Sequence, residues 1–309
     1  MAQSLKPSLD TPPLDTLGDL FRFAVRRFRA ARLAYGHGTT NVIDEAAFLL
    51  LEGLRLPIHN IDPWLALRPT AAEKARLLTL IDARISLRLP APYLVGAAYM
   101  HGVRFHVDKR ALIPRSFIGD MLVAGALPIT EARKVRRVLD LCTGSGCLAI
   151  LAALAFPAAT VDAIDLSRGA LALARRNIAT HRLGDRIMLH HGDLFSALAG
   201  QRYDLIISNP PYVDARGMDH LPPEFRHEPR MALAAGKDGL DLVHRILAEG
   251  SRHLTKQGAL LCELGRGRKP LERAYPHTPF VWLDTALSSG EVFWLERGGF
   301  PAMASKGDR

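Results

Sequence analysis

The sequence has little cysteine, no long hydrophobic run and no repeated or low-complexity segment. Its three cysteines are Cys142, Cys147 and Cys262, and no two of them have the Cys-x-x-Cys spacing. An odd number without close pairs argues against both a disulfide framework and a zinc cluster. The longest apolar run covers 147–156, far less than the roughly 20 residues that a membrane-spanning helix needs. We therefore expect neither a metal site nor a membrane segment.

The first residues of the sequence do not have the pattern that predicts a secretory signal peptide. The first ten residues, MAQSLKPSLD, contain no apolar stretch of signal-peptide length, so we expect a cytoplasmic protein. Hydrophobic residues make up 48% of the 309 residues. This composition excludes disorder as the main state, and the length is sufficient for two domains.

Lysine is scarce relative to arginine. Only 8 of the 40 basic residues are lysine, and the formal net charge is +9. A basic protein can associate with RNA, but these residues are scattered along the chain rather than clustered. Charge alone therefore leaves both an RNA partner and a simple compositional bias open.

The first hundred residues have the pattern of a small helical domain. Apolar residues in 17–28 recur at the spacing of a helix that buries one face. Further helices are predicted at 44–54 and 70–89, the latter beginning with Thr70 and Glu73 at capping-box spacing. Alternation of apolar and polar residues at 103–108, flanked by glycines, predicts a β-hairpin within 93–114.

Strands and helices alternate from residue 135 onward. Strands are expected at 138–141, 161–165, 187–190, 205–208, 259–263, 281–284 and 291–295, and helices at 147–156, 170–180 and 240–254. Such alternation predicts an α/β fold with a mostly parallel sheet of seven strands, covered on both faces. A short loop separates the last two strands, so we expect them to pair antiparallel.

A glycine-containing loop follows the first of these strands. The segment Asp140-Leu-Cys142-Thr143-Gly144-Ser145-Gly146 leads from an apolar strand into a helix, which is typical of a nucleotide-like cofactor site. Gly144, Gly146 and Ala149 also fit G-x-G-x-x-A, which leaves a dinucleotide open.

Two acidic positions follow the next strands. Asp165 ends the second strand, where a carboxylate can accept hydrogen bonds from ribose hydroxyls; the alternative is a helix cap. Asp193 and Leu194 follow the third strand. There a carboxylate can accept from the amino group of adenine, and an apolar side chain can cover its ring.

The segment Asn209-Pro210-Pro211-Tyr212 follows the fourth strand and carries the most specific signal. The prolines fix the backbone and remove two N–H donors, so the loop offers carbonyl acceptors and the Asn209 side-chain oxygen. An aromatic ring lies beside them. These parts suit a planar amino group, either of a carboxamide or of a nucleobase, aligned toward an electrophilic methyl group.

The chain resembles the class I glutamine methyltransferases of the HemK/Prm family. The resemblance rests on the glycine loop, on 161–165, on 192–195 and on Asn-Pro-Pro-Tyr at 209–212. The strings Tyr-Gly-His-Gly-Thr at 35–39, Leu-Ile-Pro-Arg-Ser at 112–116 and Arg-His-Glu-Pro at 226–229 are similar to the branch that acts on the third protein of the large ribosomal subunit.

The resemblance implies a Rossmann-like methyltransferase domain at 116–309, a helical substrate-recognition domain at 1–92 and a hairpin linker at 93–115. It also implies S-adenosylmethionine as cofactor and a glutamine side chain as acceptor. The implied cofactor contacts are Cys142, Thr143, Gly144, Ser145, Gly146, Asp165, Asp193, Leu194 and Asn209. The glutamine would meet Asn209, Pro210, Pro211 and Tyr212. Asn209, Pro210 and Tyr212 would carry the catalysis.

Three other functions stay open at this point. One is methylation of a release factor, the substrate of the sister branch, and another is methylation of adenine in nucleic acid. The third is cofactor binding without catalysis. A basic ribosomal protein as substrate gives no electrostatic reason for a basic enzyme, so the net charge indicates either a contact with ribosomal RNA or a compositional bias.

Overall fold

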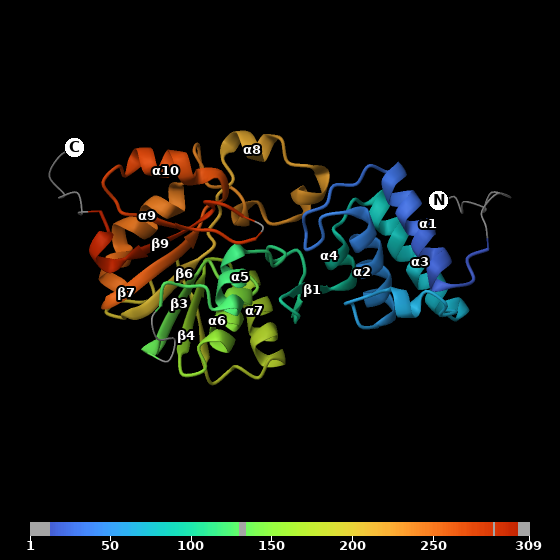
Figure 1. Ribbon diagram of the computed structural model, residues 1–309, viewed down its shortest axis with the longest axis horizontal. Coiled ribbons are helices and arrows are strands. Elements are labelled where there is room, and N and C mark those ends of the chain that lie inside the picture. The colour runs from blue at the N-terminus through green and yellow to red at the C-terminus, as the bar shows by residue number, and fades with distance from the viewer. Residues whose placement is uncertain (1–12, 130–133, 287, 302–309) are drawn as a thin grey trace. The chain divides into compact units, whose positions relative to one another are not determined.

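The computed structural model describes residues 13–129, 134–286 and 288–301 (Figure 1). The chain forms two compact units, one ending at Val95 and the other beginning at Gly96. The first ten residues, from which the expectation about targeting was drawn, lie outside the described ranges.

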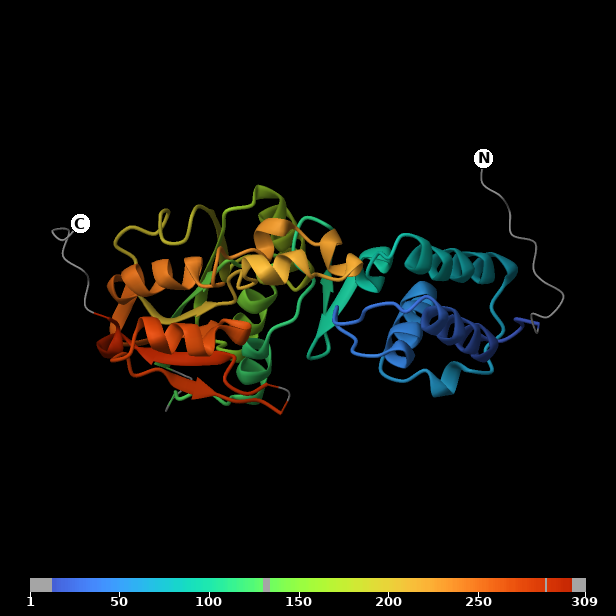
Figure 2. The same ribbon diagram turned by 90° about the horizontal axis from the view of Figure 1, so that it is seen from above.

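Between residues 13 and 95, the structure describes four α-helices and one short 3-10 helix. They are α1 (Leu17–Ala30), α2 (Val42–Leu54), the 3-10 helix at Asp62–Trp64, α3 (Ala71–Ser86) and α4 (Ala91–Val95). Figure 2 shows α1, α2 and α3 packed beside one another. The apolar residues that predicted the first helix are buried in their common core, except Phe21, which is partly buried against it, so that prediction is confirmed.

The start of α3 was predicted correctly and its end was not. Thr70 accepts from the Glu73 amide and the Glu73 carboxylate accepts from the Thr70 amide, which completes the expected capping box. The helix ends at Ser86 rather than at 89. Arg88 has a positive φ of 50°, so the chain leaves the helical conformation before Pro90.

The hairpin consists of β1 (Ala97–Met100) and β2 (Val103–His106), which pair antiparallel as expected. The two residues between the strands, His101 and Gly102, both have positive φ, which suits the tight turn of a two-residue hairpin loop. The side chain of Asn177 then joins the hairpin to the larger fold. It accepts from the His106 amide at 2.7 Å and donates to the His106 carbonyl at 3.1 Å.

A seven-stranded sheet has the order β5-β4-β3-β6-β7-β9-β8. Its strands are β3 (Arg137–Leu141), β4 (Thr160–Asp165), β5 (Ile187–His191), β6 (Tyr203–Ser208), β7 (Leu254–Glu263), β8 (Val281–Leu283) and β9 (Val292–Glu296). All neighbours are parallel except β9, which is antiparallel to both β7 and β8. This topology confirms the predicted α/β fold of the class I methyltransferases.

Helices cover both faces of the sheet (Figure 1). Contacts place α5 (Phe117–Ala124), α6 (Cys147–Ala155) and α7 (Arg168–Thr180) on one face. The other face carries α9 (Asp241–Glu249) and α10 (Arg268–Ala274), whose apolar residues share a core with β3, β6 and β7. A short α8 (Ala215–Asp219) and 3-10 turns at 223–227 and 230–232 lie in the loop after β6. The sequence did not predict α5, α8 or α10.

The helix expected at 240–254 is shorter than predicted. It ends at Glu249, and a 3-10 turn at Gly250–His253 leads into β7. The turn is required because Leu254 pairs with Tyr203 at the start of the sheet register. Gly250 also lies against the Phe300 ring, where a β-carbon would be 2.9 Å from a ring atom.

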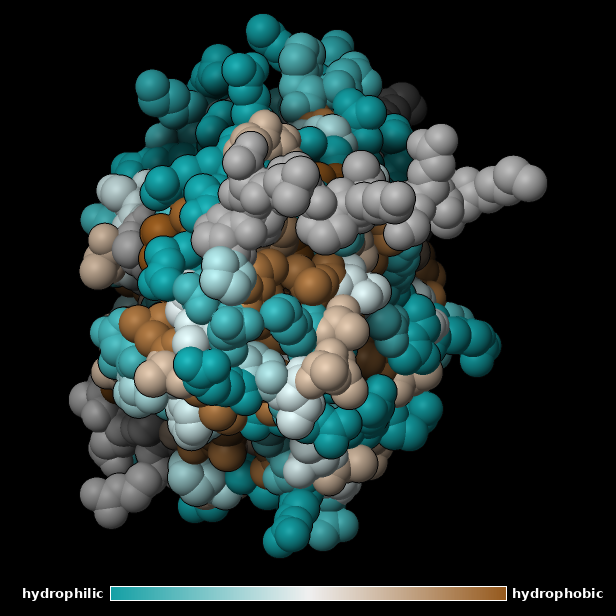
Figure 3. Space-filling model, turned by 90° about the vertical axis from the view of Figure 1, so that its right-hand side faces the viewer, coloured by the Kyte–Doolittle hydropathy of each residue, from teal (hydrophilic) through white to brown (hydrophobic). Residues whose placement is uncertain are grey.

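Hydrophilic side chains predominate on the face shown in Figure 3, with apolar side chains in smaller groups between them. Within the described residues, no helix has the length and hydrophobicity needed to cross a bilayer.

Candidate functional site

The loop after β3 turns sharply at residues with positive φ. Cys142, Gly144 and Gly146 have φ values of 61°, 57° and 80°. A β-carbon on Gly146 would lie 3.1 Å from the Ala174 β-carbon, so glycine here lets the loop pack closely against α7. The Thr143 amide donates to the Ile164 carbonyl at 3.0 Å, which ties the loop to β4.

Asp140 lies buried beneath this loop. Its Oδ2 accepts from the Thr143 hydroxyl at 2.6 Å and from the Ala149 amide at 3.0 Å, while its Oδ1 has no hydrogen-bond partner among the described residues. Burial in this position raises the pKa of Asp140 to about 7. The carboxyl group therefore holds the loop to the first turn of α6.

Asp165 fixes the loop from the side of β4. Its Oδ2 accepts from the Gly144 amide and its Oδ1 from the Ser167 amide, both at 2.8 Å. The cap of α7 is Ser167, whose hydroxyl accepts from Ala170, so Asp165 is not the helix cap. Burial raises the pKa of Asp165. Each carboxylate oxygen can still accept a second hydrogen bond.

Asp193 and Leu194 follow β5, as the sequence indicated. The Asp193 carboxylate forms an ion pair of 2.9 Å with Arg245 of α9, and both side chains are half exposed. Leu194 is buried and has a φ of 48°. The partner Arg245 was missed, because nothing near residue 193 in the sequence points to it.

Asn209 has a defined orientation at the end of β6. Its Nδ2 donates to the backbone carbonyl of Arg115 at 3.3 Å. Because the amide nitrogen is used in this way, Oδ1 is the atom left to accept from a substrate. Pro210 and Pro211 follow and are both buried.

Arg115 is itself fixed by a buried carboxylate. Its guanidinium donates to both oxygens of Glu228, at 2.7 and 2.6 Å, and Glu228 also accepts from the Ile113 amide at 3.0 Å. The strings at 112–116 and 226–229, noted in the sequence only as marks of a family branch, therefore meet in one ion pair that supports Asn209.

Tyr212 lies between a glycine and a third buried carboxylate. A β-carbon on Gly265 would be 2.9 Å from the Tyr212 ring, so the ring rests directly on that backbone. The hydroxyl donates to Glu263 Oε1 at 3.4 Å. Burial raises the pKa of the Tyr212 hydroxyl and raises that of Glu263 to about 7.

One cavity lies at the carboxyl ends of β3, β4, β5 and β6. Seven residues predicted for the site line it: Cys142, Gly144, Asp165, Asp193, Leu194, Asn209 and Pro211. Arg110, Leu112, Ser167, Met231 and Leu242 are among the lining residues that the sequence did not suggest. The remaining predicted residues, Thr143, Ser145, Gly146, Pro210 and Tyr212, do not line this cavity.

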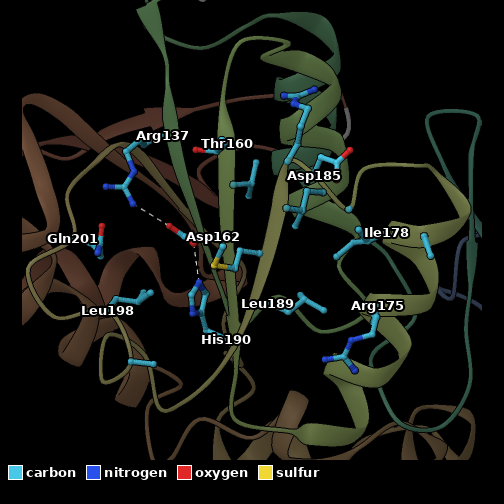
Figure 4. Close-up of a pocket in the computed structure, with 17 residues that line it drawn as sticks. Arg137, Thr160, Asp162, Arg175, Ile178, Asp185, Leu189, His190, Leu198 and Gln201 are labelled. Atoms are coloured by element: carbon cyan, nitrogen blue, oxygen red, sulfur yellow. Dashed lines mark hydrogen bonds and ion pairs between the residues drawn. The ribbon is translucent and has the colours of Figure 1, made fainter.

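A second hollow surrounds β5 and reaches the amino ends of β3 and β4 (Figure 4). There Asp162 contacts Arg137 at 3.2 Å and His190 at 2.7 Å, and it accepts from the Tyr203 hydroxyl at 2.9 Å. None of the predicted site residues lines it. Ligands of parallel α/β sheets bind at the carboxyl ends of the strands, so the first cavity is the candidate site. Across the described ranges, no cluster of three or more metal-ligating side chains is found.

Comparisons with known proteins show to which family the chain belongs. A family model described as Methyltransferase small domain matches residues 119–267. A ribosomal protein uL3 glutamine methyltransferase from Bradyrhizobium diazoefficiens is 53% identical over 290 residues, covering 91% of each chain. One of the same name from Bordetella pertussis is 52% identical over 285 residues, covering 92% of this chain and 96% of that protein.

The chain belongs to the uL3 glutamine methyltransferase family. The predicted resemblance, including its ribosomal-protein branch, is thereby confirmed. A solved methyltransferase from Pyrococcus furiosus is 16% identical, with a TM-score of 0.46 over 74% of this chain and 99% of that one.

In this member of the uL3 glutamine methyltransferase family, two buried carboxyl groups predict how stability depends on pH. The pKa values of Asp140 and Glu263 rise from 3.8 and 4.5 to about 7 on folding. The folded state therefore binds protons that the unfolded state has released. We expect the free energy of unfolding to fall as the pH rises from about 4 to about 7, by up to roughly 1.4 kcal/mol per unit of pKa difference.

Urea denaturation between pH 4.5 and 8.5 measures this dependence. Asp140→Asn and Glu263→Gln should each make the profile flatter, because each removes one of the two titrating groups. Profiles that stay parallel to that of the wild type would contradict the assignment.

Proposed function

We propose that the protein transfers a methyl group from S-adenosylmethionine to the side-chain amide nitrogen of a glutamine in uL3, the third protein of the large ribosomal subunit. The curated relatives carry this activity in their names. The observation that carries the proposal is the orientation of Asn209, whose Nδ2 is held by the Arg115 carbonyl so that Oδ1 is free to accept.

The first cavity fits a nucleoside cofactor. Asp165 can accept hydrogen bonds from the ribose hydroxyls. Leu194 offers an apolar surface to the adenine ring, and Asp193 can accept a hydrogen bond from the amino group of the adenine. Gly144 lets a ligand approach the backbone. S-adenosylmethionine supplies an electrophilic methyl group when bound. The residues present thus fit this cofactor.

The loop at 209–212 suits an amide acceptor. An amide nitrogen is a poor nucleophile because its lone pair is delocalised. Asn209 Oδ1 and the Pro210 carbonyl would accept its two hydrogens and stabilise the positive charge that develops on the nitrogen. The C–N bond forms as the methyl–sulfur bond of the cofactor breaks, S-adenosylhomocysteine is the leaving group, and the nitrogen then releases one of its two protons to solvent. The two prolines supply no competing N–H donor, and the buried position of Pro210 and Pro211 keeps water from the acceptors.

The partners of this reaction follow from the proposed substrate. We assign substrate recognition to the helical unit at 1–92 and cofactor binding to 116–309, with 93–115 as the linker, and we place the reaction in the cytoplasm. A contact with ribosomal RNA stays a prediction from charge. Part of the arginine charge is already neutralised by ion pairs within the chain. The carboxylate partners are Asp19, Asp82, Glu45, Asp108, Glu228, Asp162, Asp193 and Glu272.

Cofactor binding tests the role of Asp165. Isothermal titration should detect binding of S-adenosylmethionine or S-adenosylhomocysteine and no comparable binding of NAD. Asp165→Ala should weaken binding by roughly 1–3 kcal/mol, because it removes hydrogen bonds to ribose and frees the Gly144 amide. Asp165→Asn, which keeps one acceptor, should lose less. Wild-type affinity in both variants would remove Asp165 from the site.

Substitution of Asn209 tests the acceptor loop. Asn209→Ala should lower the single-turnover rate at saturating cofactor about a hundredfold or more, while cofactor affinity changes little, because the lost acceptor acts on the reacting nitrogen. Asn209→Asp should bind cofactor and still transfer slowly, since it cannot donate to the Arg115 carbonyl. If Asn209→Ala reacts at the wild-type rate, the loop is only scaffolding.

The choice of substrate is tested by mass spectrometry after incubation with S-adenosylmethionine. We expect methylation of a glutamine in unassembled uL3, and little modification of a release factor or of an adenine-containing RNA. Preferential methylation of the release factor or of adenine would replace the proposed function by one of those alternatives. Transfer to none of the three would leave a cofactor-binding module.

A further inference from the structure

Glu263 is a buried carboxylate that the mechanism so far does not use. It ends β7, is 2% exposed and divides its two oxygens between two segments. Oε2 accepts from the Ser116 hydroxyl at 2.6 Å and from the Phe117 amide at 2.9 Å. Oε1 accepts from the Tyr212 hydroxyl at 3.4 Å.

The surroundings of Glu263 do not compensate the burial of its carboxylate. No basic side chain in the described ranges forms an ion pair with it, and Glu291, before β9, adds a like charge nearby. The positive charge of Arg115 lowers the pKa of the Tyr212 hydroxyl, but the guanidinium donates its hydrogen bonds to Glu228 rather than to Glu263. The remaining neighbours are the donors at 116–118 and the buried Cys262 thiol. A buried carboxylate without a counter-ion destabilises the folded state, so a glutamine or an apolar residue at this position would give a more stable fold.

We propose that Glu263 is a positioning residue for methyl transfer, which fixes the Tyr212 ring beside the acceptor amide through the tyrosine hydroxyl. The inference rests on the proposed function and adds a residue to its machinery. Gly265 supports one side of the ring and Glu263 holds its far end. Tyr212 does not line the cavity itself, but it directly follows Pro211, which does. A ring fixed at two points restrains the loop at 209–212, so an amide held by that loop has little freedom to turn.

A double-mutant cycle tests this link. Tyr212→Phe keeps the ring and removes the hydroxyl, and Glu263→Gln keeps an acceptor for Ser116 and Phe117. Each should lower the single-turnover methylation of uL3 about tenfold at saturating substrates, with S-adenosylhomocysteine affinity within twofold of wild type. Because both act through one contact, the double variant should be no slower than the slower single variant.

The chain offers a matched control at the other end of the sheet. The Tyr203 hydroxyl also donates to a carboxylate, that of Asp162, at 2.9 Å. Tyr203→Phe should therefore lower stability and leave the methylation rate and the Michaelis constant within twofold of wild type. An equal loss of rate in Tyr203→Phe, or rate losses that multiply in the double variant, would overturn the proposal and leave Glu263 as an anchor of α5.

A readout without cofactor or substrate separates this inference from the proposed function. In protein with 13C-labelled tyrosine, the Cζ resonance of Tyr212 is identified by its loss in Tyr212→Phe. It should shift with pH around 7 in the wild type, as Glu263 ionises, and not in Glu263→Gln. A resonance insensitive to pH in both would overturn the link. Failure of wild-type protein to methylate uL3 would reject the function, and the resonance would still decide the contact.

Discussion

The ion pair between Arg115 and the buried carboxylate of Glu228 is the contact on which the orientation of the loop at 209–212 depends. It fixes the segment at 113–117, and that segment presents a backbone carbonyl to Asn209 and a hydroxyl to Glu263. Breaking such a pair by removing one partner leaves an uncompensated buried charge, which is strongly destabilising. The loop after β6 is rigid in itself because of its prolines, and this pair sets the direction in which its side chains face.

Local sequence patterns pointed to many of the residues that line the candidate cavity. The chain leaves each parallel strand at the same edge of the sheet, so motifs that follow β3, β4, β5 and β6 converge without any knowledge of side-chain contacts. The sequence pattern could not distinguish residues that line the cavity from residues that only hold the loop in place. Thr143, Ser145 and Gly146 belong to the motif, yet they hold the loop against Asp140, α7 and β3 rather than face the cavity.

The supporting residues could not be found in the same way, because their partners are distant in sequence. Glu228 lies 113 residues from Arg115, and Glu263 lies 147 residues from Ser116. No periodicity connects such positions, and a glutamate at the end of a buried strand gives no sign of the donors it will meet. The predicted helix ends were wrong for a related reason. The helix before β7 ends earlier than predicted because Leu254 pairs with β6 in the sheet, and this tertiary constraint overrides local helix propensity.

The placement of charge at the loop 209–212 suits a reaction with an electrophilic methyl group. A carboxylate or a thiolate within reach of such a group is itself a nucleophile and would compete with the substrate. The acceptor loop offers only neutral oxygens, while Glu228 is paired with Arg115 and Glu263 lies behind Tyr212. Cys142 does line the cavity, but burial and the nearby carboxylates raise the pKa of its thiol, so it stays protonated and weakly nucleophilic. Burial is the larger cause of this raised pKa, and Asp165, Asp140 and Asp193 add to it. Asp140 and Asp165, which hold the loop after β3, thus also keep the Cys142 sulfur weakly reactive.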